Sequence, residues 1–282
     1  IKLTPGDIVF NILNYLFFIL FTLSCIFPFY YIFINTISNN ELVKKGVITF
    51  LPQQITIQNY IMMANVNDLW NSFVVTILRT LIGTVLMVFA SALAGYLMTK
   101  QEMWHRKFWY RFLVITMYFN AGLIPTYLNL SMLGLTNTFL VYIIPAIVSP
   151  YNIILVKTYV ESIPGEIEES AYIDGSGTFR TFVQIILPLS IPMMITIFLF
   201  AFSWQWTDNF YTKVFFTKSS MVLMPDVVAI PKTLDTQYAA QNLYESAIRN
   251  TCGLLILAPL LVVYIFMQKY LVGGIERSGI VG

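Results

Sequence analysis

Two stretches of this otherwise apolar sequence carry side chains suited to recognising a partner or a ligand. From Ser162 to Pro188 it reads "SIPGEIEESAYIDGSGTFRTFVQIILP", with four carboxylates, one arginine and three glycines. Glu166, Glu168 and Glu169 would lie near the positive end of a helix dipole, and glycines would follow its other end, which is typical of a short, capped helix. The later stretch, "FSWQWTDNFY", joins aromatic rings to a carboxylate and amides. These are the groups that bind sugars by stacking and hydrogen bonding.

Residues suited to catalysis or metal binding are scarce. The chain has one histidine, His105, and two cysteines, Cys25 and Cys252, which lie in apolar runs without metal-ligand spacing. No nucleophile–base pair suggests itself, and no glycine-rich loop ends in Lys-Ser or Lys-Thr. We therefore expect no enzyme, no metal site and no cofactor on this chain. A net charge of +2 also gives no electrostatic basis for binding nucleic acid.

The composition indicates a membrane protein. The chain is 57% hydrophobic and 11% charged, with a mean hydropathy of +0.73, whereas soluble domains carry about 25% charged residues. Five runs lack Asp, Glu, Lys and Arg altogether: 8–40, 80–99, 112–156, 181–207 and 250–268. A transmembrane helix needs about 20 mostly apolar residues. The run 112–156 can hold two such helices, joined by the polar turn "LSMLGLTN".

The predicted fold is all-α: a polytopic membrane protein with six transmembrane helices in a single domain over residues 1–282. The spans are expected at about 9–37, 71–99, 108–129, 138–158, 184–206 and 250–271. The loop between spans two and three, "TKQEMWHRKFWYR", carries four cationic side chains. By the positive-inside rule, this loop and both termini are predicted to be cytoplasmic. Arg79 is expected near the outer end of span two, with its side chain snorkelling to the interface.

The segment 162–183, between spans four and five, is predicted to form a helix, a tight turn and a second helix on the cytoplasmic face. Ser162 would cap the first helix, with Pro164 in its first turn. Gly175 and Gly177 would supply positive φ in the turn. An ordinary polar loop would explain the glutamates, but not the capped helix and glycine turn. A helix projecting from the membrane with an apolar strip that includes Ile167 and Ala171, followed by Phe179 presented outside the bilayer, suits a groove on a partner.

Two prolines, Pro188 and Pro192, stand four residues apart at the start of span five. Each removes a backbone donor, and prolines inside helices bend them. We therefore predict a bend or break between the loop helix and the upright part of span five.

The same segment resembles the EAA loop of bacterial ABC-importer permeases. Glu169, Ser170 and Ala171 are followed by Gly175 and then by Ile185, Leu187 and Pro188 at the family's spacing, with Ser170 where alanine is usual. The string "SIPGEIEESAYIDGSG" is similar to the carbohydrate-importer branch, the maltose-type second permease. The flanking strings "AGLIPTYLNLSMLGLTNTFLVYIIPAIVSPYNIIL" and "FSWQWTDNF" extend the likeness to the subgroup that imports oligosaccharides from complex polysaccharides.

This resemblance implies a multi-pass permease subunit of an ATP-driven carbohydrate importer in the bacterial cytoplasmic membrane. Its expected partners are a second homologous permease, two cytoplasmic ATPase subunits that hold ATP and Mg²⁺, an extracellular or periplasmic solute-binding protein, and the lipid bilayer. The implied ATPase-coupling residues are Glu169, Ser170, Ala171, Asp174, Gly175, Phe179 and Arg180. The C-terminal "GGIERSGIVG" also resembles the family's glycine-rich tail, which in some members reaches between the ATPase subunits; a frayed terminus is the alternative.

The candidate substrate path is read from sugar-binding side chains. These are Asn120, Tyr127, Asn152, Trp206, Asp208, Asn209 and Tyr211. The alternatives are an aromatic belt at the membrane interface for the rings, including Trp204, and bundle packing for the amides. The partner permease could instead make the sugar contacts.

Two other functions stay open at this point: the same machinery carrying a non-sugar solute, and a structural or assembly subunit. An ion-coupled transporter fits poorly, because the predicted span interiors contain no carboxylate.

Overall fold

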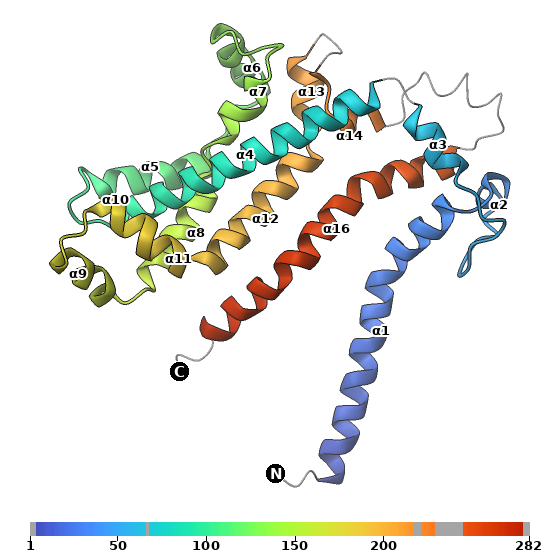
Figure 1. Cartoon of the computed structure of the whole chain (residues 1–282), viewed down its shortest axis with the longest axis horizontal. Coiled ribbons are helices and arrows are strands. Elements are labelled where there is room, and N and C mark those ends of the chain that lie inside the picture. The colour runs from blue at the N-terminus through green and yellow to red at the C-terminus, as the bar shows by residue number, and fades with distance from the viewer. Residues whose placement is uncertain (1–3, 66–67, 217–220, 229–244, 279–282) are drawn as a thin grey trace. The chain divides into compact units, whose positions relative to one another are not determined.

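The described residues of this chain are helical and include no β-strand. The computed structural model describes residues 4–65, 68–216, 221–228 and 245–278. Figure 1 shows the helices. They fall into two compact units, one drawn from residues 1–69 and 228–257, the other from 70–227 and 258–282.

The first unit contains α1 (Pro5–Thr36), α2 (Asn40–Lys44), α3 (Gln58–Ala64) and the first part of α16 (Glu245–Ser278). A capping box between Thr4 and Asp7 begins α1. The α1 side chains from Ile8 to Phe33 are largely exposed apolar groups, as expected of a helix that contacts lipid or a partner. Near its C-terminal end the Asn59 side-chain amide donates to the Thr36 carbonyl at 2.9 Å.

The second unit carries both polar stretches. It is built from α4 (Leu69–Leu97), α5 (Arg106–Tyr118), α6 (Leu123–Met132), α7 (Leu140–Ile143), α8 (Pro150–Glu161), α9 (Gly165–Ile173), α10 (Thr178–Thr181), α11 (Leu187–Leu189), α12 (Ile191–Thr207), α13 (Phe210–Phe215) and α14 (Met224–Val228), with the last part of α16. In it, α8 packs against α5 and α12. One core cluster joins Tyr96 on α4, Val156 on α8, Phe182 after α10 and Ile197 on α12.

Helices α4 and α8 approach each other closely at Gly95. A Cβ added there would stand 2.7 Å from the Val156 Cβ and 2.9 Å from the Ile153 carbonyl oxygen. We expect Gly95→Ala to lower the free energy of unfolding by about 1–3 kcal/mol, because overpacking forces backbone to move. Gly253→Ala, whose added methyl meets open space, is the matched control. Thermal unfolding of the detergent-solubilised chain measures both, and equal midpoints would contradict the prediction.

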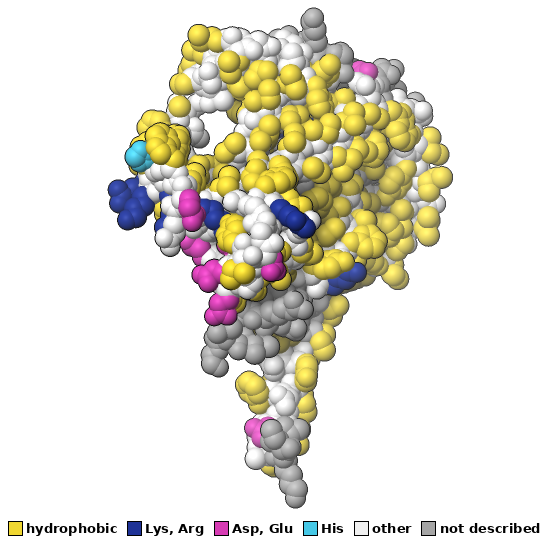
Figure 2. Space-filling view, turned by 60° about the vertical axis from the view of Figure 1, so that its left-hand side comes forward, with side chains coloured by type: hydrophobic (Ala, Val, Ile, Leu, Met, Phe, Trp, Pro, Cys, Tyr) yellow, Lys and Arg dark blue, Asp and Glu magenta, His cyan; other side chains and the backbone are white. Residues whose placement is uncertain are grey.

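The helices confirm an all-helical polytopic membrane protein. Three are long and apolar enough to cross a bilayer: Pro5–Thr36, Leu69–Leu97 and Ile248–Tyr270. Three bent pairs of helices also pass the same test, so the chain has three candidate spans, or up to six if each bent pair is one span. On the face drawn in Figure 2, hydrophobic side chains cover most of the surface, and charged side chains occupy a small part of it.

The predicted bend at the start of span five is confirmed. The helical stretches Thr178–Leu189 and Ile191–Thr207 meet at 83°. The break falls at Ser190, between the two prolines, where φ is −93° and ψ is 10°. The residues Phe182–Ile186 just before it form a π-helical turn, a local widening that often accompanies such bends.

The region predicted as the third span is two helices rather than one. Helices α5 and α6 meet at 119°, with Phe119 to Gly122 between them. The Asn120 side-chain oxygen accepts from the Gly122 amide at 2.9 Å, and Gly122 adopts a φ of +89°. A glycine with positive φ and an asparagine that bonds the backbone two residues on both favour a turn. The polar turn expected in "LSMLGLTN" is present, with Gly134 at a φ of +69°.

Candidate functional sites: the α9–α10 segment and the end of α12

The polar segment between α8 and α10 is a helix, a tight turn and a second helix, as predicted. Its start differs from the prediction. Helix α9 begins at Gly165 after Pro164, and Ser162 instead ends α8, where its hydroxyl donates to the Tyr159 carbonyl at 2.6 Å. The assignment of Ser162 as the cap of α9 was therefore wrong, because α8 continues through Glu161 and Ser162 caps the C-terminal end of that helix.

One glycine makes the turn that follows α9. Gly175 has a φ of +79°, and its amide donates to the Tyr172 carbonyl at 3.0 Å. The Ser176 amide donates to the Ala171 carbonyl at 2.9 Å, which closes a glycine C-cap of the usual kind. Gly177 was also expected to need positive φ, and that prediction was wrong. Its φ is −77°, extended backbone ahead of α10, because one left-handed residue suffices to reverse the chain.

The apolar groups that this segment exposes agree only in part with the prediction, since Ile167 and Phe179 are exposed as expected and Ala171 is not. Ala171 is buried against its own unit, whereas Ile173 is 86% exposed and Phe179 is 62% exposed. Glu169 and Ser170 are also exposed. Helical spacing alone identified a face containing Ala171, but only the packing of α9 decides which face is free. The exposed surface of the segment thus combines carboxylates with two large apolar side chains flanking the Gly175 turn.

A carboxylate that the sequence analysis assigned only to the helix dipole joins α9 to α4. Glu168 accepts hydrogen bonds at its Oε1 from the Tyr96 hydroxyl at 2.7 Å and from the Tyr172 hydroxyl at 3.0 Å, and it forms an ion pair with Lys100. The Lys100 ammonium nitrogen lies 4.1 Å from the centroid of the Tyr96 ring, in cation–π contact. Tyr96 and Lys100 precede Glu168 by about 70 residues, so no local pattern could reveal the contact.

Partial burial of the Lys100 ammonium lowers its pKa, to about 8, while the nearby Glu102 carboxylate acts in the opposite direction. Contact with the Glu168 carboxylate also favours the charged ammonium. With a pKa of about 8, Lys100 is mostly a charged ammonium at neutral pH.

The second polar stretch ends α12 beside α4. Arg79 is fully buried in α4, and its Nη2 donates to the Asp208 carboxylate at 2.7 Å. Its guanidinium carbon lies 5.0 Å, 5.6 Å and 5.9 Å from the ring centroids of Tyr142, Trp204 and Tyr211. The prediction that Arg79 snorkels was wrong. A carboxylate and three aromatic faces compensate the buried guanidinium, so it need not reach water.

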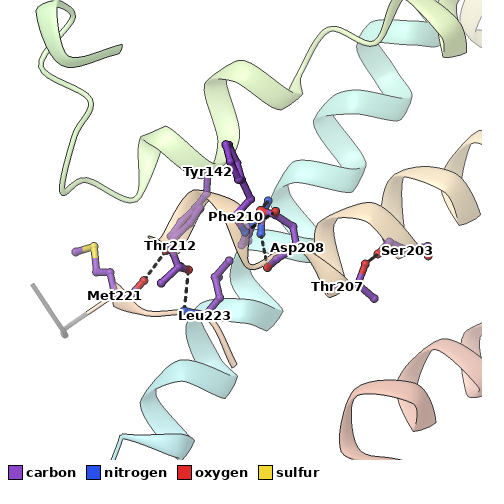
Figure 3. A network of polar contacts seen from close by, with 9 residues as sticks. Tyr142, Ser203, Thr207, Asp208, Phe210, Thr212, Met221 and Leu223 are labelled. Carbon is purple, nitrogen blue, oxygen red and sulfur yellow. Dashed lines mark hydrogen bonds and ion pairs between the residues drawn. The ribbon is translucent and has the colours of Figure 1, made fainter. Parts of the chain in front are cut away.

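Hydrogen bonds fix the residues around this ion pair. Figure 3 shows the Asp208 carboxylate beside the backbone amide of Phe210, which donates to it at 2.9 Å. The Tyr142 hydroxyl bonds to Thr212 at 3.0 Å and donates to the Met221 carbonyl at 2.8 Å (Figure 3). The Leu223 amide in turn donates to the Thr212 hydroxyl at 3.3 Å. The turn from α12 into α13 is thus held rigidly against α4 and α7.

Four of the predicted substrate-path residues make contacts within the structure, although Tyr127 is also 40% exposed. Trp206 is 3% exposed and stacks on Phe202 at 6.2 Å. Asn152 is 4% exposed, with its amide 3.5 Å from the Met87 sulfur. Tyr127 stacks on Phe215 at 5.7 Å. Asp208 is the partner of Arg79. The contact of Asn152 is of the bundle-packing kind considered as the alternative for the amides.

An open cavity of about 360 Å³ lies between α8, α12 and α13. Its polar and aromatic lining includes Asn152, Trp204 and Tyr211, and Met87, Phe200 and Pro150 contribute apolar surface. Asn152 and Tyr211 come from the predicted set. Trp204, which the sequence analysis assigned to an interfacial belt, joins them. Asn120, Tyr127, Trp206, Asp208 and Asn209 do not line it.

Almost the whole chain matches one family of transport proteins. The model of the "Binding-protein-dependent transport system inner membrane component" family matches residues 4–277. The chain belongs to this family. The match confirms the predicted ABC-importer permease, its location in the inner membrane as a multi-pass protein, and its function as a transport subunit rather than an enzyme.

Individual relatives span almost the whole chain. The polygalacturonan/rhamnogalacturonan transport system permease protein YtcP of Bacillus subtilis is 27% identical, over 97% of this chain and 99% of its own length. Protein LplC of the same organism is 30% identical, over 99% of this chain and 97% of its own length. A crystal structure of a bacterial ABC transporter involved in the import of the acidic polysaccharide alginate contains a chain with a TM-score of 0.85 and 25% identity. The match covers 96% of this chain and 99% of the chain in that crystal structure.

Proposed function

We propose that this permease is one of two homologous membrane subunits of an ATP-driven importer of oligosaccharides released from complex polysaccharides. Two cytoplasmic ATPase subunits would bind and hydrolyse ATP, and an extracellular or periplasmic binding protein would deliver the sugar. The relatives support the substrate class, since YtcP is named for polygalacturonan and rhamnogalacturonan and the similar structure is of an alginate importer. Both names refer to polysaccharides, which favours a sugar over another solute.

The proposed topology has six spans and both termini in the cytoplasm. Three long helices and three bent pairs of helices supply the six. The spans correspond to about 9–37, 71–99, 108–129, 138–158, 184–206 and 250–271, with the coupling segment 162–183 between the fourth and fifth. The four cations of the stretch 99–111, which runs from the end of α4 into α5, support this orientation. The proposed contact of the C-terminal tail with the ATPase falls partly on residues 279–282, which lie outside the described residues.

The observation that carries the proposal is the α9–Gly175–α10 hairpin. A short helix with acidic residues in its first turn ends at a left-handed glycine, and two exposed apolar side chains, Ile173 and Phe179, flank that turn. Exposed apolar groups rimmed by charges mark interaction sites. We propose that this hairpin docks on the ATPase and carries its movement to the membrane helices.

Within that site, the proposed coupling residues divide by their exposure. Glu169, Ser170 and Phe179 face outward and would contact the ATPase directly. Gly175 sets the turn, and Ala171, being buried, would seat α9 on its own subunit rather than on the partner. Asp174 and Arg180 flank the turn and are exposed.

The cavity between α8, α12 and α13 is the proposed contribution of this subunit to the sugar path. A sugar ring would stack on Trp204 or Tyr211 and hydrogen-bond with the tyrosine hydroxyl or the Asn152 amide. A cavity of about 360 Å³ lies within the usual range for small-molecule sites.

Transport into proteoliposomes tests the proposal. The complete transporter, with its cognate binding protein, is offered oligosaccharides of galacturonate and of alginate, a neutral maltooligosaccharide and a non-sugar solute. We expect ATP-dependent uptake of one or more of the sugars. Uptake of the non-sugar solute alone would overturn the substrate class. No uptake of any solute by an intact, ATP-hydrolysing complex would favour a structural subunit.

Within that assay, Trp204→Ala should lower sugar uptake about fivefold, because one stacking contact contributes about 1 kcal/mol. Trp104→Ala is the matched control, since Trp104 is exposed and does not line the cavity. The amount of assembled complex is measured for both, because Trp204 also contacts Arg79. Wild-type uptake by Trp204→Ala would place the sugar contacts in the partner permease.

A further inference from the structure

We propose that Glu168 is a positioning residue that clamps the coupling helix α9 to the C-terminal end of α4, so that the two helices move as one body. The inference rests on the proposed docking of the α9–α10 hairpin on an ATPase. It adds the route by which a displacement of that hairpin enters the membrane helices. A carboxylate that only complements the helix dipole would not need to contact α4.

Three donors converge on the Glu168 side chain. The Tyr96 and Tyr172 hydroxyls donate to the same oxygen, Oε1, at 2.7 Å and 3.0 Å, and the Lys100 ammonium forms an ion pair with it. Tyr172 lies one turn further along α9 itself, so it orients the carboxylate. Tyr96 and Lys100 lie one turn apart at the end of α4. Hydrogen bonds to an ionised acceptor are about twice as strong as neutral ones.

The clamp is shielded from water. The side chains of Lys100 and Glu168 are 12% and 19% exposed, whereas Glu169 on the same helix is exposed. Tyr96 is fully buried, and its ring stacks on Phe182 at 5.2 Å with an interplanar angle of 27°. Because exposed ion pairs contribute little and shielded ones more, this contact differs from a solvated surface pair.

Helix α4 then connects the two sites of this unit. Its C-terminal end is bound to α9 through Glu168, and Arg79, 17 residues before Tyr96, is bound to Asp208 at the end of α12. At 1.5 Å per residue these points lie about 26 Å apart on one uninterrupted helix. A displacement of α9 is therefore delivered to the residues beside the cavity through α4, in addition to the covalent path through the bend at Ser190.

Hydrogen–deuterium exchange of the backbone amides of α9, in the assembled transporter, tests the clamp without a transport substrate. Glu168→Gln keeps the shape of the side chain but removes its charge. We expect it to raise exchange in α9 by about tenfold, roughly the factor that one charge-assisted hydrogen bond represents. Lys100→Met should do the same, and Lys100→Arg, which keeps the cation, should not. Glu161→Gln is the control, since it removes an exposed ion pair with Lys157 outside α9.

The ratio of ATP hydrolysed to sugar imported distinguishes a positioning role of Glu168 from a purely stabilising one. For equal amounts of assembled complex, Glu168→Gln and Lys100→Met should raise the ATP hydrolysed per sugar imported by about threefold or more. Lys100→Arg and Glu161→Gln should leave that ratio at the wild-type value. Unchanged exchange in α9 overturns the clamp, and so does raised exchange with an unchanged ratio. If the wild-type complex imports no sugar, the proposed function fails while the exchange result still decides the contact.

Discussion

Asp208→Ala is expected to cost the chain about 3–5 kcal/mol of unfolding free energy, because it leaves the fully buried Arg79 guanidinium without its counter-charge. Asp208→Asn should cost somewhat less, since the single amide oxygen still accepts one of the two bonds that Asp208 accepts at Oδ2 from Arg79 and at Oδ1 from the Phe210 amide. The measurement is the amount of assembled complex in the membrane and its thermal unfolding midpoint in detergent.

A double variant provides the internal control. Replacing a buried ion pair with apolar side chains of similar size is often neutral or stabilising, whereas removing one partner is not. We therefore expect Arg79→Met combined with Asp208→Leu to recover most of the stability that either single change removes. Lys213→Met, which removes the cation of a more exposed pair with Asp226, should have an effect below about 1 kcal/mol. A wild-type midpoint for Asp208→Ala would show that the ion pair contributes little.

A transport defect in an Asp208 variant would then arise from poor assembly rather than from a lost sugar contact. The sequence suggested a carboxylate in the sugar path, which would impair uptake without affecting assembly. Since Asp208 is paired with Arg79 and does not line the cavity, we expect assembly to suffer first. Uptake normalised to assembled complex distinguishes the two roles.

Gly175→Val is the second change with a large expected effect. Gly175 has a φ of +79°, where a β-branched side chain is strained by about 1–3 kcal/mol. The space around it is open, so the effect arises from the backbone and not from a clash. We expect the α9–α10 turn to lose its geometry, and the complex to lose stimulated ATP hydrolysis or to shed its ATPase subunits. The membrane helices should still insert.

Two neighbouring changes control this result. Gly177→Ala places a methyl group in equally open space at a φ of −77°, which any residue adopts, so it should behave as wild type. Gly175→Asn should be tolerated better than valine, because asparagine visits the left-handed region more readily. Co-purification of the ATPase with the permease and ATP hydrolysis stimulated by the binding protein are the measurements. Equal coupling by Gly175→Val and Gly177→Ala would exclude the turn as the determinant.

Much of the architecture follows from the sequence because its signals are local. Uncharged runs long enough for a bilayer indicate where the candidate spans lie, since hydrocarbon cannot solvate charge. The pair Pro188 and Pro192 determines the bend at Ser190 by removing backbone donors. The spacing from Glu169 to Gly175 determines the hairpin and the family resemblance that the comparison confirms. Each of these effects acts within a few turns of one helix.

Only the tertiary structure decided what the polar side chains contact. Arg79 and Asp208 are 129 residues apart, and Tyr96 and Glu168 are 72 apart, so their pairing depends on how α4 packs against α12 and α9. Packing likewise buried Ala171 and Trp206 and left Ile173 free. Within a membrane helix every face can be apolar, and hydrophobic periodicity then no longer indicates which side meets protein and which meets lipid. A charged or aromatic group there acquires its role from the neighbour that long-range packing supplies.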